Sequence, residues 1–368
     1  MREVAIIGIG QTPVREHWDR SLRELAVEAV WEALTDAERE TVEALYVGNM
    51  LSGPLADQEH LGALVADQAG LQGVEAVKVE AACASAAAAF RQAVMAVASG
   101  MVDSAVAVGV EKLTERSGTH TTHGLATAAD ADYETALGLT FVALNALLMR
   151  RYMHVYHYDK EDFAPFVIQA HQNAVHNPLA LFRHPITLEQ YRRAKMIADP
   201  ICLLDSSPIG DGAAAVVVVP AERRKRALRV QACEVATDTV ALHDRRDPLW
   251  LTAVERSTAR ALQTAGVDHR QIDLFELHDA FSIMSVLSLE AAGFAERGTA
   301  PRLANEGTLA VTGRLPVATF GGLKGRGHPV GATGLYQIVE ACRQLRGEAP
   351  EAIQVPEARR AMTQNIGG

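Results

Sequence analysis

The sequence predicts an α/β protein made of two similar halves with mainly parallel sheets covered by helices. Short apolar runs alternate along the chain with longer segments that are apolar on one face, which is the pattern of strands and covering helices. The order of these segments repeats beyond residue 220, so we divide the chain into halves at 1–220 and 221–368. The first half also contains a long insertion, at about 111–209, whose periodicity is less regular.

In the first half, Val4–Ile9 is the first expected strand, and Ser21 is placed to cap an amphipathic helix behind it. Within the insertion we expect two helices, Gly138–Tyr152 and Lys160–Val175, the second capped by Asp159. The remaining expected strands are 43–47, 77–79, 104–110 and 213–219, and the remaining expected helices are 61–69 and the stretch from the bend at Cys83 to Gly100.

The second half shows the same order of elements. When the halves are compared element by element, Cys83 and His328 occupy equivalent corners between a strand and a helix. In this comparison the second half lacks its last strand. The first half has a further strand at the equivalent point, where the second half has only Asn365–Gly368. The expected strands are 229–235, 272–277, 315–320 and 361–364, and the expected helices are 248–266, 281–292 and 332–345.

The composition indicates a soluble globular protein. The chain has 368 residues, 48% of them hydrophobic and 22% charged, which is sufficient for two domains with cores of their own. The net charge of −10 and the absence of a long basic run argue against nucleic-acid binding. The one local exception, Arg223–Arg226, is interpreted as a solvated turn between the halves.

The sequence gives no indication of a membrane, a disulfide framework or a metal site. Met1–Gly10 is interpreted as a strand and not as a signal peptide, and no apolar run approaches the roughly 18–20 residues of a membrane helix. His120 and His123 have metal-like spacing, but no carboxylate or cysteine nearby completes a ligand set. We therefore expect a cytoplasmic protein. The four cysteines are scattered and form no CxxC pair: Cys83, Cys202, Cys233 and Cys342.

Cys83 is the strongest candidate for a reactive group. It stands in a bend of small residues between an expected strand and an Ala-rich helix. A thiol at the first turn of a helix is close to unpaired N–H groups and to the positive end of the helix dipole, so we expect a lowered pKa. The small neighbours leave room for a substrate carbonyl. The alternative is an inert buried cysteine, which the sequence GGLKGRGHPVGATG at 321–334 disfavours.

Several short motifs in a fixed order resemble those of the thiolase superfamily, in the branch of the sterol-carrier-protein thiolases and the archaeal acetoacetyl-CoA thiolases. The resemblance covers essentially the whole chain. Each motif alone is weakly specific, but their order makes coincidence improbable. The motifs are Cys83-Ala84-Ser85, Asp211-Gly212-Ala213-Ala214-Ala215, His278-Asp279-Ala280-Phe281, Gly327-His328-Pro329 and Gly331-Ala332-Thr333-Gly334.

The resemblance implies a thiolase-like fold of two duplicated βαβαβαββ halves and a role for each motif. Cys83 would be the nucleophile that takes up an acyl group, and His328 would take its proton and donate to an oxyanion. His278 would orient a water for a second oxyanion hole. Each histidine also has a purely structural alternative. His328 would satisfy backbone groups in a turn, and His278 would only stand beside Asp279, which would cap a helix. The implied substrate-binding residues are Gly327, Gly331, Ala280 and Phe281, with Lys324 and Arg326 toward a phosphate of coenzyme A.

The sequence also departs from the family pattern at the second cysteine, the base that removes the α-proton in ordinary thiolases. Asn365-Ile366-Gly367 stands where the C-x-G motif is expected, and Ala280 stands where the sterol-carrier branch has its cysteine. An asparagine cannot act as a base. Acyl transfer to Cys83 therefore looks intact, while a carbon–carbon step needs another base, such as His328 or His278.

The resemblance implies an acyl-CoA acyltransferase of the acetyl-CoA acetyltransferase type, with a coenzyme A thioester as substrate and no permanently bound cofactor or metal. One alternative is an aldol lyase of the same fold that acts on a coenzyme A thioester with a small partner containing an OB-fold and a zinc ribbon. Another is a non-catalytic scaffolding subunit. The expected partners are acyl-CoA, a second copy in a homodimer or dimer of dimers, and that small partner protein, without nucleic acid or membrane.

Overall fold

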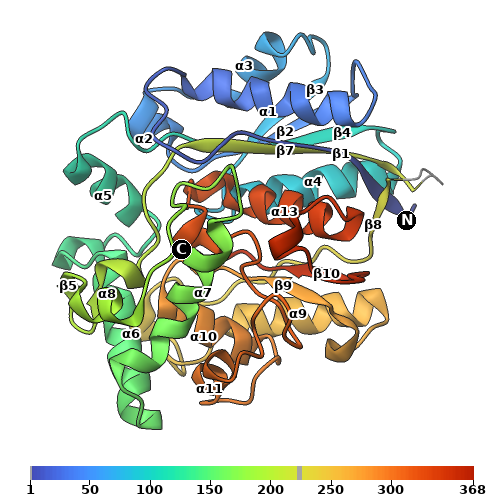
Figure 1. Cartoon of the computed structure of the whole chain (residues 1–368). Helices are drawn as coiled ribbons and strands as arrows, with labels where there is room; N and C mark the ends of the chain where they lie inside the picture. Colours follow the sequence, from blue (N-terminus) through green and yellow to red (C-terminus); the bar gives the residue numbers. More distant parts are fainter. Residues whose placement is uncertain (1, 222–225) are drawn as a thin grey trace.

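The computed structural model describes residues 2–221 and 226–368, and its elements form alternating layers of helix and sheet (Figure 1). The first layer consists of helices on the outer face of a six-stranded sheet, and the second layer is that sheet, with the order β3-β2-β4-β7-β1-β8. Four of its strands are buried along most or all of their length because the sheet has helices on both faces. The strands are β1 (Val4–Gln11), β2 (Ala44–Gly48), β3 (Glu75–Val79), β4 (Ala105–Glu111), β7 (Gly212–Pro220) and β8 (Leu228–Val230).

This sheet is mixed, which corrects the expectation of a mainly parallel one. Strand β2 pairs in parallel with β3 and β4, whereas β7 is antiparallel to both β4 and β1, and β8 is antiparallel to β1. The reason is that the chain leaves the sheet at Glu111 and returns at Gly212, its pairing partner at the same end. The long insertion thus joins β4 and β7 as a hairpin joins antiparallel strands.

The outer helices are α1 (Leu22–Asp36) and α3 (Leu61–Gln68). The predicted cap of α1 is confirmed, because Ser21 accepts from the Glu24 N–H and the Glu24 carboxylate accepts from the Ser21 N–H. Helix α1 buries its apolar face against the sheet in a core that includes Leu25 and Val30. These contacts fix the first half around its sheet.

Helices α4 (Ser85–Ser99) and α13 (Thr333–Arg346) pack against each other beneath the sheet and form the middle layer (Figure 1). Their first turns approach so closely that a Cβ on Gly334 would lie 2.7 Å from the Ala87 nitrogen. Because α4 follows Cys83 and α13 follows His328, the predicted correspondence of these two corners agrees with the structure.

The segment Ala82–Ser99 has the length and mean hydropathy of a membrane span, which corrects the expectation that no apolar run reaches that length. The segment includes the whole of α4, which packs between the sheet and α13. Burial inside the protein accounts for part of its apolar character, because 39% of the segment is buried.

The second half is less regular than predicted. Strand β9 (Leu274–Glu276) pairs in parallel with β10 (Ala361–Thr363), but 315–320 contributes a single bridge, from Val317 to Phe275. The extended run ends there because Ala318 has a left-handed φ of 49° and the Thr319 N–H bonds to the Glu276 carboxylate. The helices of this half besides α13 are α9 (Thr252–Ala265), α10 (Ser282–Ala291), α11 (Ala300–Asn305) and α12 (Gly322–Gly325).

The strand predicted at 229–235 is shorter and joins the first sheet as β8, beside β1. The boundary between halves at residue 220 stays a prediction, and β8 shows that a segment beyond it completes the sheet of the first half. Of the basic cluster at 223–226, residues 223–225 lie outside the described residues. Arg226 forms ion pairs with Asp36 and Glu348.

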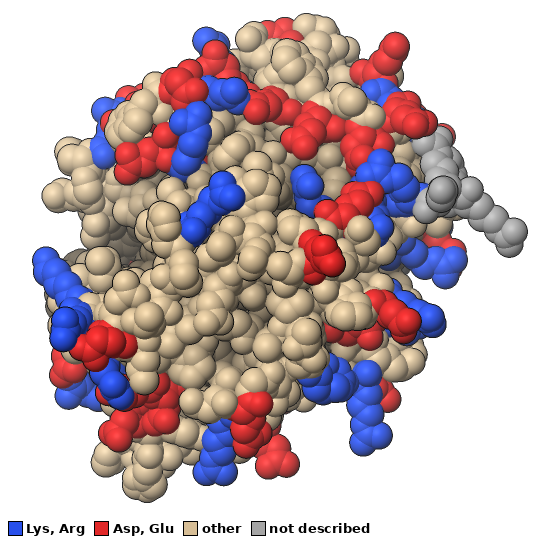
Figure 2. Space-filling view, in the orientation of Figure 1, with Lys and Arg blue, Asp and Glu red and all other residues tan. Residues whose placement is uncertain are grey.

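The insertion carries both helices predicted for it. Asp159 forms a capping box at the short turn of 3-10 helix that precedes the second of them. Figure 2 shows acidic and basic side chains mixed around the edge of one face, without a continuous basic band. The helices between β4 and β7 are α5 (Gly118–Ala126), α6 (Phe141–Tyr156), α7 (Ala164–Ala174) and α8 (Leu188–Arg193); the strands are β5 (Met196–Ala198) and β6 (Ile201–Cys202), and α2 (Ser52–Ala56) follows β2.

The packing of α4 on the sheet predicts that Gly48 tolerates no side chain. A Cβ there would lie 2.4 Å from the Ala86 Cα, so Gly48→Ala must push α4 off the sheet, at a cost of about 1–3 kcal/mol. We expect a clearly lower midpoint of thermal unfolding. Gly118→Ala is the control, because nothing lies within 4 Å of its added Cβ. Equal midpoints for both variants would contradict this packing.

Candidate active site

Cys83 lies in the bend between β3 and α4, two residues before the helix begins at Ser85. The Ser85 hydroxyl holds the bend, because it accepts from the Ala81 N–H at 2.9 Å and donates to the Ala82 carbonyl at 2.6 Å. Cys83 is half-buried, in contrast to Cys202 and Cys342, which are buried. The sequence therefore placed the candidate nucleophile at an accessible corner.

The pKa of Cys83 corrects the expectation of a thiolate. Burial, together with the carboxylates of Glu111 and Glu80, raises the pKa of this thiol to about 12, although the backbone N–H groups of Cys83 and Gly368 act in the opposite direction. The helix dipole has little influence because the helix starts beyond the thiol and two carboxylates lie nearby. In the resting protein Cys83 is a neutral thiol.

His328 lies in a buried turn before α13 that is fixed on two sides. Its Nδ1 is 2.7 Å from the Thr333 hydroxyl oxygen, which orients the imidazole ring. Gly327 has a φ of 111°, and a Cβ there would lie 2.6 Å from Val14 Cγ1. Only glycine fits this conformation and this space.

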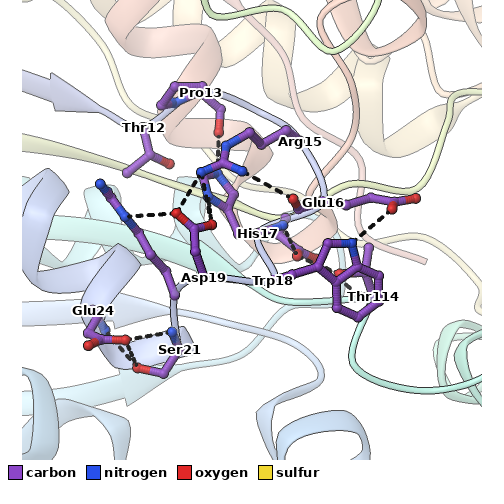
Figure 3. Close-up of polar contacts among 12 residues, drawn as sticks. Thr12, Pro13, Arg15, Glu16, His17, Trp18, Asp19, Ser21, Glu24 and Thr114 are labelled. Atoms are coloured by element: carbon purple, nitrogen blue, oxygen red, sulfur yellow. Dashed lines mark hydrogen bonds and ion pairs between the residues drawn. The ribbon is translucent and has the colours of Figure 1, made fainter.

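The loop between β1 and α1 packs against that turn through Val14. Figure 3 shows the polar contacts within this loop. Its His17 ring lies with Nε2 2.8 Å from the Pro13 carbonyl, and Arg15 binds Asp19 through both carboxylate oxygens. These contacts hold the loop that carries Val14, the side chain packed under Gly327. The N-terminal segment of the chain thereby positions a histidine more than 300 residues later.

His278 faces His328 edge-on, with ring centroids 5.2 Å apart. Burial, together with the positive charges of Lys324 and Arg326, lowers the pKa of His278 to about 3. Burial also holds the pKa of His328 well below its usual range. Both imidazoles are therefore neutral at physiological pH.

The segment Asn365–Gly368 connects the histidines to the cysteine. Asn365 Nδ2 lies 2.9 Å from His278 Nδ1, and the backbone N–H of Gly368 acts to lower the pKa of the Cys83 thiol. Three residues of extended chain span at most about 10–11 Å. The structure thus brings the three predicted catalytic residues together around this segment.

Lys324 and Arg326 do not lie where the sequence analysis expected them. Each side chain is only 1% exposed, so neither cation is available to a phosphate of coenzyme A. Lys324 donates to the Asp279 carbonyl at 2.5 Å, and Arg326 pairs with Glu340 at 3.3 Å. Burial of a charge requires such partners. These pairs correct the predicted phosphate contacts.

The other predicted substrate-binding residues surround the histidines. Ala280 and Phe281 are buried in the core of the second half, and Gly331 donates its N–H to Glu111. Gly327 and Gly331 flank the turn of His328. Contacts of these four residues with a substrate stay a prediction.

Sequence reasoning missed Glu111 and Thr333 as polar partners of the catalytic corners. Glu111 is a carboxylate at the end of the otherwise apolar strand β4, which is a signal that the sequence contains. Among the described residues no group of three His, Cys, Asp or Glu side chains is placed to hold a metal ion.

Two family models match the chain on either side of residue 230. The model of the thiolase N-terminal domain matches residues 4–222, and the model described as thiolase C-terminal domain-like matches residues 235–368. This chain belongs to the thiolase family. The family and the fold predicted from the sequence are confirmed.

Relatives of this thiolase include an acetyl-CoA acetyltransferase from Methanothermobacter thermautotrophicus, 44% identical over 100% of this chain and 97% of the relative. Sterol carrier protein 2 from Bos taurus is 28% identical, over 99% of this chain and 70% of the relative. Among solved structures, the Ltp2-ChsH2(DUF35) aldolase matches with a TM-score of 0.84 and 26% identity, over 99% of this chain and 94% of that one. The acyltransferase class predicted from the sequence is confirmed by the relatives that are acetyl-CoA acetyltransferases.

The neutral thiol predicts the pH dependence of Cys83 alkylation. Only the thiolate reacts, and a pKa of about 12 means that its fraction rises about tenfold per pH unit through the neutral and mildly alkaline range. We expect the rate of modification by iodoacetamide, followed by mass spectrometry of the Cys83 peptide, to rise without a plateau up to pH ~10. A plateau below pH ~8 would show an activated thiolate and contradict the assignment.

Proposed function

We propose that this thiolase transfers an acyl group from a coenzyme A thioester through an acyl-enzyme on Cys83, with acetyl-CoA as the substrate. The observation that supports it is the convergence of one accessible thiol with two neutral, buried imidazoles around Asn365–Gly368. The relative from Methanothermobacter thermautotrophicus, an acetyl-CoA acetyltransferase, supports the choice of substrate. The protein is proposed to act in the cytoplasm, without a permanent cofactor.

The hydrogen bonds of the two imidazoles divide their roles. With the Asn365 amide oriented as in the structure, Nδ2 donates to His278 Nδ1, so the proton of His278 is on Nε2. His278 is then a hydrogen-bond donor to the substrate. His328 can donate from Nδ1 to the Thr333 hydroxyl, which leaves its Nε2 free to accept a proton.

In the acylation step the Cys83 sulfur attacks the thioester carbonyl as its proton passes to His328 Nε2. The carbon–sulfur bond to coenzyme A breaks, and the proton of His328 goes to the departing thiolate. The product is a thioester on Cys83 and free coenzyme A. The N–H groups at the Cys83 bend are donors suited to stabilise the oxyanion between these two events.

In the second step a base removes an α-proton from another acyl-CoA, whose enolate carbon attacks the acyl group on Cys83. The new carbon–carbon bond forms as the Cys83 thiolate leaves and regains a proton. His328 is the proposed base, because Asn365 and Ala280 stand where the family's second cysteine is expected and His278 Nε2 already carries its proton. His278 would donate a hydrogen bond from its Nε2–H group to the enolate oxygen.

A second candidate is the aldol lyase with a small partner protein. The absence of the second cysteine and the likeness to the Ltp2-ChsH2(DUF35) aldolase favour it. The lyase differs from the acyltransferase in that it carries no acyl group on Cys83. The scaffolding alternative has less support, because the thiol and both histidines are present and close together.

Three variants test the division of roles. Cys83→Ala should form no acyl-enzyme, and His328→Ala should acylate about 10²–10⁴-fold more slowly because it lacks the base. His278→Ala should acylate nearly normally and lose the carbon–carbon step. Quenched-flow mass spectrometry with acetyl-CoA measures the acyl adduct. If the unmodified enzyme forms no adduct but cleaves a β-hydroxyacyl-CoA, the lyase hypothesis is correct. If it neither forms an adduct nor cleaves this compound, the scaffolding hypothesis is correct.

The oligomeric state is proposed from the edge of the first sheet. Strand β3 pairs with β2 on one side only, and Val77 in the middle of β3 is 43% exposed. An open edge strand with an exposed apolar residue is a site for pairing with a second copy. The partly exposed residues at 81–84 and 87–88 continue this surface around Cys83.

A charge at this edge should prevent dimer formation. Val77→Lys places an ammonium group where two β3 strands would meet, so we expect a monomer in sedimentation at micromolar concentration. Met101→Lys is the control, because Met101 is 78% exposed at the far end of α4. A Val77→Lys protein that sediments as the unmodified protein does would refute this interface.

A further inference from the structure

The Glu111 carboxylate lies at the end of β4, fully buried, and accepts four hydrogen bonds. Oε1 accepts from Asn49 Nδ2 at 2.8 Å and from the Leu51 N–H at 3.1 Å. Oε2 accepts from the Met50 N–H at 2.9 Å and from the Gly331 N–H at 3.1 Å. Three of these donors follow β2 in the first half, and the fourth comes from the second half.

The loops that carry these donors border both catalytic corners. Met50 packs in one apolar cluster with Cys83 and Val330. Gly331 stands three residues after His328, and a Cβ on Gly331 would lie 2.5 Å from the Glu111 Oε2 atom. The carboxylate therefore joins the surroundings of the thiol to the turn of the imidazole.

We propose that Glu111 is a positioning residue for acyl transfer, whose carboxylate holds the turn of His328 at a fixed distance from Cys83. The proposal rests on the proposed function, since it concerns the acylation of Cys83. Glu111 does not touch the reacting atoms. It acts through Gly331 on one side and through Met50 and Leu51 on the other.

The pattern of donors requires a carboxylate and not merely a polar side chain of that size. Each oxygen accepts from two N–H groups, so a glutamine amide in either orientation would turn its NH₂ group toward two donors. An amide of the same shape would therefore lose two hydrogen bonds and repel the N–H groups. The two loops would move apart by the distance needed to relieve that contact.

The negative charge gives the proposal a second, independent readout. Glu111 lies near enough to Cys83 to raise the pKa of the thiol, and Glu80 acts in the same direction. Burial raises the pKa of Glu111 itself to about 7, against its backbone hydrogen bonds and the charge of Lys78. Removal of the charge at Glu111 should therefore make Cys83 easier to ionise while it impairs catalysis.

The first experiment compares Glu111→Gln with Glu290→Gln. Glu290 is also a buried glutamate, but it accepts from Tyr152 and the Ala300 N–H through Oε1 in the core of the second half. We expect Glu111→Gln to slow acylation of Cys83 by acetyl-CoA about 10²-fold, the loss that a misplacement of about 1 Å causes. Its iodoacetamide profile should shift to lower pH. Glu290→Gln should change neither.

The second variant, Gly331→Ala, disturbs the same contact and keeps the charge. Its added methyl group pushes on the Glu111 carboxylate, so acylation should slow while the alkylation profile of Cys83 stays in place. This variant decides the matter if Glu111→Gln fails to fold, as judged by circular dichroism. If Gly331→Ala, or a folded Glu111→Gln, acylates at the unmodified rate, the proposal is wrong.

Equal slowing in Glu111→Gln and Glu290→Gln would also overturn it, because the effect would then be general destabilisation. Failure of the proposed function is distinguishable from both outcomes, because the unmodified enzyme would then form no acyl adduct. The pH profiles of Cys83 alkylation do not depend on turnover. They can therefore be compared among the variants whether or not the enzyme forms an acyl adduct.

Discussion

Helices α4 and α13 approach each other at their first turns with no side chain between them, and the positions of both catalytic corners depend on this contact. A Cβ on Gly109 would lie 2.8 Å from the Ala332 Cα, so the end of β4 is part of the same close packing. Cys83 leads into one helix and His328 into the other. A site built at the ends of two rigid, interlocked helices is held more accurately than one carried by loops alone.

Buried carboxylates hold the loops around this contact. Asp211 accepts from the N–H groups of His17, Leu113 and Thr114, and Glu276 accepts from the N–H and hydroxyl groups of Thr319. A buried charge is costly unless hydrogen bonds compensate it, and here each compensating donor comes from a segment far away in the sequence. The same bonds that offset the cost of burial thus fix the mutual positions of distant loops.

The sequence predicted the strands β1, β2, β4 and β7 and helix α1 well, because these strands are continuous apolar runs and the helix has both a cap and an apolar face. It failed at 315–320, where the run is also apolar, because the left-handed Ala318 and the bond from Thr319 to Glu276 override strand propensity. Neither contact is visible in the local pattern.

The candidate site was predicted in its residue types but not in its electrostatics. The pattern placed Cys83 beside a helix, yet Glu111, which raises the pKa of its thiol, is 28 residues away in the sequence. Lys324 and Arg326 were expected to face a phosphate of coenzyme A, but the fold buries both side chains. Their partners Asp279 and Glu340 become apparent only when the fold brings them together.

The presence of Asn365 where the family has its second cysteine changes the chemistry that the site can perform, but it leaves the thiol and both imidazoles in place. A cysteine at that position would exchange protons with substrate, whereas an amide can only fix the tautomer of the neighbouring imidazole. In the proposed mechanism His278 then presents an N–H donor to a substrate oxygen. A thioester enolate needs such a donor whether its carbon–carbon bond is being formed or broken, by microscopic reversibility. In the proposed mechanism Cys83 and His328 therefore distinguish the two reaction classes, because they determine whether an acyl group is carried on the enzyme to receive that enolate.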